Sequence, residues 1–158
     1  MTMDLLPFFE WCETTTLGLL VRESVWLFPV IEAVHLLGLC LLGGSLLLVD
    51  LRLLGTGLTG TPVSTLARQA RPWLMTAVVV MIATGLLLFL SESVKCYYNQ
   101  AFWVKITTLP LALIFTFAVR QRVIGVDGAT RTAERLAGAT SLALWFTVAA
   151  AGRWIGFS

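Results

Sequence analysis

Four ionisable side chains lie inside apolar stretches of this sequence and could carry chemistry. Glu32 and His35 are three residues apart in one stretch, and Lys105 and Arg153 lie in two others. Residues with this spacing share a helix face, so Glu32 and His35 are expected to point the same way. Charges at such positions are costly and are usually paired inside a bundle. The pattern predicts a buried polar pair of Glu32 with Lys105 or Arg153, beside His35, in one half of the bilayer.

A second interpretation of the same residues is purely structural. The side chains of Lys105 and Arg153 are long and start near the ends of their stretches, so they could extend to the membrane surface. Glu32 and His35 would then only join neighbouring helices by hydrogen bonds. The sequence leaves both interpretations open.

His35 is the only histidine of the chain and the one side chain that could serve as a neutral imidazole ligand. Near mid-membrane it could be the axial ligand of a b-type haem, with Met81 as a second ligand. Lys105 and Arg153 lie nearer the surface, where they could meet the anionic propionates. We therefore predict a cofactor site formed by His35, Met81, Lys105 and Arg153.

Metal binding through His35 is the other chemical interpretation. A soft ion such as Cu(I) could be bound by His35 with Cys40, Met75 or Met81. The signatures Cys-x-x-Cys-His and His-Glu-x-x-His are absent, as is the Gly-x-Ser-x-Gly elbow of serine hydrolases. The leading hypothesis is a haem-binding or redox role. The alternatives are a component for transport of a metal ion or small solute, and a structural accessory subunit of a membrane complex.

The elements that must position these residues are hydrophobic helices. The 158 residues are 58% hydrophobic and 13% charged, and runs of about 20 apolar residues predict membrane spans. We predict an all-α membrane protein, a four-transmembrane-helix bundle that forms one domain over residues 1–158. The predicted spans are 26–49, 72–91, 101–119 and 136–157. Before them we expect a short interfacial helix over 4–20, or an arm packed on the bundle.

The segments between the spans are expected to be irregular and charged. Glycine and proline exclude a long helix within 51–71, and polar loops are expected at 92–100 and 120–135. Lysine and arginine gather at 51–71 and 120–135, which predicts that both termini face outward, towards the periplasm if the chain lies in a bacterial inner membrane. Cys12 and Cys96 then fall on the outer side, and a disulfide between them would need close Cα atoms.

The expected partners follow from composition. A net charge of +2 spread over several loops provides no basic stripe, which argues against nucleic acid. The lipid bilayer is the expected surrounding, and short spans with little internal volume favour a homo-oligomer or a larger membrane complex.

Several stretches carry a family resemblance that covers most of the chain from Val25. The chain resembles a family of small, uncharacterised bacterial four-helix membrane proteins in Glu32-Ala-Val-His35, Gly43-Gly44, Asp50-Leu-Arg52-Leu-Leu-Gly55, Ala101-Phe-Trp-Val-Lys105, Ser141-Leu and Gly152-Arg153-Trp154-Ile155. It is more distantly similar to the copper-resistance D-type proteins and the HemJ-type protoporphyrinogen oxidase, whose four-helix bundle is held to bind b haem. The shared elements are His35 followed by glycines and Arg52, and Trp103 with Lys105. This distant similarity implies a haem b cofactor, although Gly152-Arg153-Trp154 replaces the lysine-proline ending of the oxidase.

Overall fold

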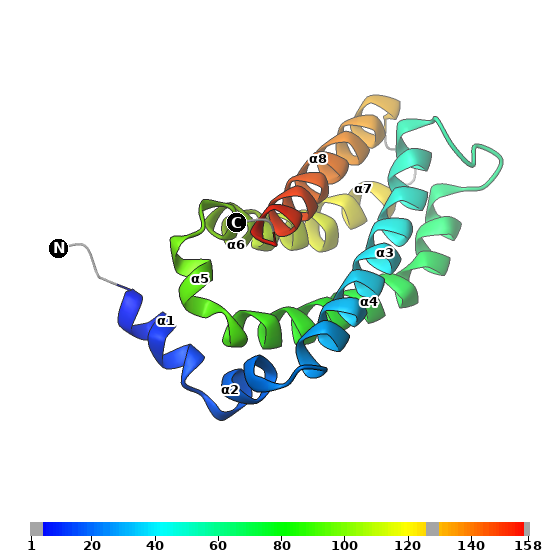
Figure 1. Cartoon of the computed structure of the whole chain (residues 1–158). Coiled ribbons are helices and arrows are strands. Elements are labelled where there is room, and N and C mark those ends of the chain that lie inside the picture. The colour runs from blue at the N-terminus through cyan, green and yellow to red at the C-terminus, as the bar shows by residue number, and fades with distance from the viewer. Residues whose placement is uncertain (1–4, 126–129, 157–158) are drawn as a thin grey trace.

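The structure is a computed structural model that describes residues 5–125 and 130–156 (Figure 1). Within these ranges the regular elements are all helical. They are α1 (Leu6–Glu13), α2 (Thr16–Glu23), α3 (Leu27–Leu54), α4 (Val63–Ser91), α5 (Ser93–Tyr98), α6 (Gln100–Ile114), the π-helical turn η1 (Phe115–Arg120), α7 (Gln121–Gly125) and α8 (Arg131–Ile155). This arrangement confirms the all-α fold class.

Three helices in the described part of the chain are long and apolar enough to cross a membrane. They are α3, α4 and the continuous stretch Gln100–Gly125, which α6, η1 and α7 form together. α8 has 25 residues but is less apolar and is not among them. The helices therefore have the composition expected of a membrane protein that is surrounded by lipid.

The connection between α3 and α4 is shorter than predicted. Gly55 ends α3 in a left-handed conformation at φ 78°, which glycine adopts without steric cost. α4 then begins at Val63, so the prediction that no long helix enters residues 51–71 was wrong, and Pro72 lies inside α4. The early turns of α4 are helical because Ala67 and Ala70 pack against buried residues of α3.

The segment after α6 was also predicted incorrectly. Residues 120–125 continue the helix beyond the expected end at 119, and α8 begins at Arg131, before the expected position 136. Thr130 accepts a hydrogen bond from the backbone N–H of Ala133 and so caps α8. The helix continues past Val119 because Arg120 is buried among neighbouring helices.

The N-terminal segment forms two short helices where one was expected over 4–20. Thr14 and Thr15 separate them, and the hydroxyl of Thr15 caps α2 by accepting a hydrogen bond from the backbone N–H of Gly18. α1 packs against α5, and α2 packs against α4. Phe9 is buried against the rings of Phe89 and Phe102. This packing agrees with an arm held on the bundle, the second of the two expectations.

The long helices form two packed pairs, α3 with α4 and α6 with α8, and the contact between α3 and α8 joins the pairs. α3 packs along α4, and α8 contacts both α3 and α6 (Figure 1). A central cluster around Leu42, Leu74, Ala112, Trp145 and Val148 draws on all four long helices. We call the end of the bundle near α5 the α5 end, and the opposite end, which carries α7 and the α3–α4 connection, the α7 end.

Candidate functional site

His35 lies in the contact between α3 and α4 and makes one specific side-chain hydrogen bond. Its Nδ1 is 2.7 Å from Oγ1 of Thr84, whose hydroxyl also lies 2.6 Å from the carbonyl oxygen of Val80. The threonine hydroxyl has one hydrogen, and it donates this hydrogen to Val80. Nδ1 of His35 must therefore be the donor to Thr84, and in the neutral form of the ring the lone pair lies on Nε2. Nε2 has no hydrogen-bond partner among residues 5–125 and 130–156.

The backbone of α4 leaves room for this imidazole. A Cβ atom at Gly85 would lie 3.3 Å from Cε1 of His35, closer than ordinary contacts. Thr84 is buried and His35 is partly buried. The ring is thus fixed on one side by Thr84 and Gly85, while Nε2 keeps the capacity to act as an acceptor or a metal ligand.

Lys105 is a partly buried cation on α6, near the α5 end. Its side chain lies along α8, where a Cβ atom at Gly152 would be 3.4 Å from Nζ. Lys105 is close enough to His35 for the two side chains to interact electrostatically. Within the described residues, its ammonium group has neither a hydrogen bond nor an ion pair. The structure therefore brings a ligand nitrogen and a cation without a counter-charge into one half of the bundle.

The expected buried polar pair of Glu32 with Lys105 or Arg153 is not formed in the structure. Glu32 is exposed and forms no ion pair with Lys105 or Arg153, and Arg153 is itself exposed on α8. The face of α3 towards α4 carries His35 and the buried Gly38. Glu32 lies three residues before His35, about 60° away from it around the helix, which is enough to leave its carboxylate outside the contact.

The sulfur residues considered as ligands differ in their surroundings. Met81 packs against Gly38 between α3 and α4, with Sδ 3.2 Å from the position of a Cβ atom there. Cys40 and Met75 are exposed. The described residues contain no group of three or more His, Cys, Asp or Glu side chains that could hold a metal ion. Met81 thus takes part in the contact between α3 and α4.

A second polar cluster, at the α7 end, was not predicted from the sequence. Nη1 of Arg120 lies 2.6 Å from Oδ1 of Asp50, and Oγ of Ser141 donates to Oδ2 over 2.6 Å. Asp50, Arg120 and Ser141 are exposed by 0%, 1% and 0%. We call these three residues the α7-end cluster; they join α3, η1 and α8.

The π-helical turn η1 supplies two of the buried polar side chains at the α7 end. Arg120 ends the turn, and Thr116 accepts a hydrogen bond of 2.9 Å from Nε1 of Trp145 on α8. Such turns often mark functional positions because they break the regular helix register. The sequence offered one signal for this cluster, since Asp50 follows an apolar run, but acidic residues there usually lie in the interface.

The disulfide considered between Cys12 and Cys96 is not formed in the structure. Cys12 and Cys96 are both free and buried in the structure. Burial raises the pKa of both thiols, that of Cys96 to about 11, where Glu92 adds to the effect and Lys105 and Lys95 oppose it. Both cysteines are therefore neutral thiols at physiological pH.

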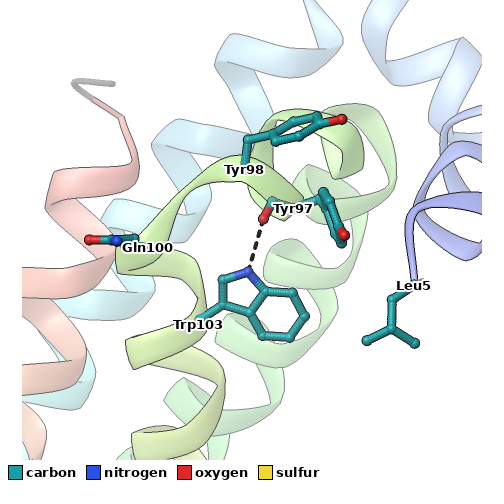
Figure 2. Close-up of a pocket in the computed structure, with 5 residues that line it drawn as sticks. All are labelled: Leu5, Tyr97, Tyr98, Gln100 and Trp103. Carbon is teal, nitrogen blue, oxygen red and sulfur yellow. Dashed lines mark hydrogen bonds between the residues drawn. The ribbon is translucent and has the colours of Figure 1, made fainter. Parts of the chain in front are cut away.

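A shallow recess at the α5 end carries aromatic side chains (Figure 2). It has a volume of about 420 Å³ and is lined by Leu5, Tyr97, Tyr98, Gln100 and Trp103. Nε1 of Trp103 donates to the carbonyl oxygen of Tyr97, and the side chain of Gln100 points away from the indole ring (Figure 2). The recess contains no titratable cluster, so it resembles the aromatic belts found at membrane surfaces.

Comparison with known proteins places the chain in a family but assigns no activity. No curated protein matches it, and no solved structure matches it. Neither comparison supports the distant similarity to the copper-resistance D-type or HemJ-type proteins. The match to one family profile covers residues 8–158, nearly the whole chain, and on that basis the protein belongs to DUF6644, a family of unknown function.

Proposed function

We propose that α8 is a fourth membrane-spanning helix. At the α7 end, a Cβ atom at Gly138 would lie 2.9 Å from the carbonyl oxygen of Asp50 on α3. At the α5 end, Gly152 lies against Lys105 of α6. The two glycines are fourteen residues apart, about 21 Å along a helix. α8 therefore runs beside two helices that are apolar enough to span, over much of the thickness of a bilayer.

The position of the two chain ends tests this topology. A chain with four spans has both ends on the same side of the membrane, whereas three spans place them on opposite sides. We expect Leu5→Cys and Gly156→Cys to react with a membrane-impermeant maleimide from the same side of oriented vesicles. Reaction from opposite sides would show that α8 does not cross.

We propose that the protein binds a b-type haem in the α5-end half of the bundle, with His35 as an axial ligand. The observation that carries this proposal is the hydrogen bond to Thr84, because it fixes the tautomer in which Nε2 bears the lone pair. Histidines that bind metals usually have their other ring nitrogen fixed in this way. Nε2 of His35 would therefore be the protein atom that holds the haem iron.

The charge of Lys105 favours haem over a bare metal ion. Lys105 has no counter-charge among the described residues, and a cation in an apolar bundle is stabilised by pairing. Haem offers an iron to Nε2 and a carboxylate to Lys105, so one ligand satisfies both groups. Arg153 is exposed one residue beyond Gly152, and its charge would suit the second propionate. When bound, haem would supply one-electron redox chemistry.

An absorption titration tests the haem proposal. The purified full chain, reconstituted with haem in detergent micelles, should show a Soret band that His35→Ala abolishes. Thr84→Val should weaken haem binding by roughly 10 to 100-fold, because the ring loses the acceptor that orients it. The matched control is Thr147→Val, which removes an exposed hydroxyl that bonds only to the carbonyl of its own helix.

The outcomes separate haem binding from the other hypotheses. A wild-type protein that stays colourless after reconstitution would overturn the proposal and leave the role of accessory subunit. Bound copper in place of haem would indicate metal handling. A Soret band that survives in His35→Ala would assign the ligand to another residue. Because Met81 is used in the α3–α4 contact, Met81→Leu should leave the reduced spectrum unchanged.

A further inference from the structure

The α7-end cluster lies far from His35 and has its own chemistry. Asp50 and His35 are fifteen residues apart on α3, about 22 Å along the helix. The apolar side chains of Leu42, Leu46 and Leu74 lie between these two levels. Asp50, Arg120 and Ser141 therefore form a site that is separate from that of His35.

The ion pair in this cluster is incompletely satisfied. Nε of Arg120 is buried and has no hydrogen-bond partner in the described part of the chain. Taking two charges out of water carries a large penalty, and apolar residues of similar volume often replace such a pair without loss of stability. An ion pair that is costly and leaves a donor unpaired is better explained by a function than by stability.

We propose that the α7-end cluster is a proton-binding site and that protonation of Asp50 releases Arg120 together with η1. One proton from the aqueous phase at the α7 end binds the carboxylate of Asp50 at Oδ1, the oxygen that faces Arg120, and no covalent bond of the chain breaks. The neutral acid keeps its hydrogen bond to Ser141 through Oδ2. The charge of the cluster changes from zero to plus one.

Arg120 lies where its side chain can move from the cluster to the aqueous interface. Arg120 is the last residue of η1, and the exposed Arg122 lies on the helix that follows. Without its counter-charge, a buried guanidinium is strongly disfavoured and must reach the aqueous interface. The π-helical turn that carries Arg120 can change its register by one residue, which provides a route for the movement.

The charged groups around Asp50 are few. Arg120 approaches it from η1, and Ser141 is the polar neighbour from α8. On α3 itself, Arg52 is engaged with the carbonyl oxygen of Thr61. On α4, Arg68 and Arg71 are exposed. On α8, Arg131 lies beside Gly55, Glu134 is partly buried and Arg135 is exposed. The charge of Asp50 is therefore balanced by Arg120 alone among these side chains.

Infrared spectroscopy of the full chain during a pH titration tests proton binding. Acidification should produce a carboxylic-acid carbonyl band that is missing in Asp50→Asn. Glu32→Gln is the matched control, because it removes an exposed carboxyl from the same helix and should leave the band in place. Ser141→Ala should shift the band, since the acid loses a hydrogen-bond partner.

Thiol labelling tests the coupled movement at a fixed pH. Ile124 of α7 packs against buried residues of α3 and α4, so a cysteine at this position should react slowly. In a Cys40→Ala background, Asp50→Asn should speed the labelling of Ile124→Cys by roughly tenfold or more, because α7 opens locally. Adding Arg120→Met should return the rate to its slow value, since no unpaired charge remains.

Three results would overturn the proposal. The first is an acid band that persists in Asp50→Asn, which would assign the proton to another group. The second is a labelling rate that Asp50→Asn leaves unchanged, which would show that Arg120 does not move. The third is an infrared band that does not shift in Ser141→Ala, and this variant provides the test if Asp50→Asn does not fold.

Discussion

Replacing Gly138 by alanine tests the closest approach between α8 and α3. The new Cβ atom would lie 2.9 Å from the carbonyl oxygen of Asp50 and 3.1 Å from Cβ of Leu53. Overpacking usually costs about 1–3 kcal/mol, and the backbone oxygen cannot turn aside, so we expect about 2–3 kcal/mol. Alanine is favoured over glycine within a helix by about 1 kcal/mol. The net loss of unfolding free energy should be about 1–2 kcal/mol.

Gly44→Ala is the matched control for this substitution. Gly44 lies inside α3, and a Cβ atom there would meet nothing within 4 Å. The variant should gain helix propensity without a clash, so its stability should equal or exceed that of the wild type by up to about 1 kcal/mol. The propensity term is common to both variants. The difference between them, about 2–3 kcal/mol, therefore measures the contact alone.

Unfolding in mixed detergent micelles, followed by circular dichroism, measures both variants under one set of conditions. Gly138→Ala should unfold at a lower denaturant fraction than Gly44→Ala. Equal midpoints would show that α8 does not approach α3 at Asp50, and the packing described for the α7 end would have to be abandoned.

Three further predictions concern other parts of the molecule. Trp145→Phe removes the hydrogen bond to Thr116 and should lower the free energy of unfolding, measured by chemical denaturation, by about 1 kcal/mol. The double variant Trp145→Phe/Thr116→Val should lose less than the sum of the losses of the two single variants. Burial raises the pKa of Cys96 from 9.0 to about 11, so the thiol of the unfolded chain loses its proton at a lower pH than that of the folded chain. The free energy of unfolding should therefore fall as pH rises from about 9 to about 11, and it should fall less in Cys96→Ala. Ser93→Ala removes the hydrogen bond to the carbonyl oxygen of Phe9, and limited proteolysis should cut the N-terminal arm faster, whereas Thr14→Ala at an exposed hydroxyl should not change the rate.

The helical architecture could be predicted because it follows from local composition. Apolar runs of sufficient length form helices wherever the backbone must satisfy its own hydrogen bonds. The helix ends were less predictable: α4 extends before Pro72 because Ala67 and Ala70 find partners on α3. That packing depends on residues far away in the sequence. Membrane orientation and oligomeric state stay predictions, because no contact within one chain depends on them.

The candidate sites were predictable to different degrees. His35 stood out because it is a single ligand-type residue in an apolar run, but its partner Thr84 is 49 residues away and is one of many threonines. Asp50 ends an apolar run, where acidic residues usually lie in the interface, and Arg120 fell at the start of the expected polar loop 120–135. Their pairing across 70 residues depends on η1, which periodicity does not reveal. The predicted ion pair of Glu32 was wrong because Glu32 and His35, three residues apart, point about 60° apart around the helix. This angle is large enough to leave Glu32 exposed while His35 lies in the helix contact.

The position of α8 between α3 and α6 has a consequence for biogenesis. α3 and α4 pack along one another and can associate as a hairpin once both have been synthesised. α6 instead packs mainly on α8, which is made later and is the least apolar of the long helices. Docking of α8 therefore depends on the surfaces that α3 and α6 already present. Until α8 has docked, Asp50 lacks its hydrogen bond from Ser141, and Thr116 lacks its hydrogen bond from Trp145. These buried polar contacts therefore form in the last step of bundle assembly.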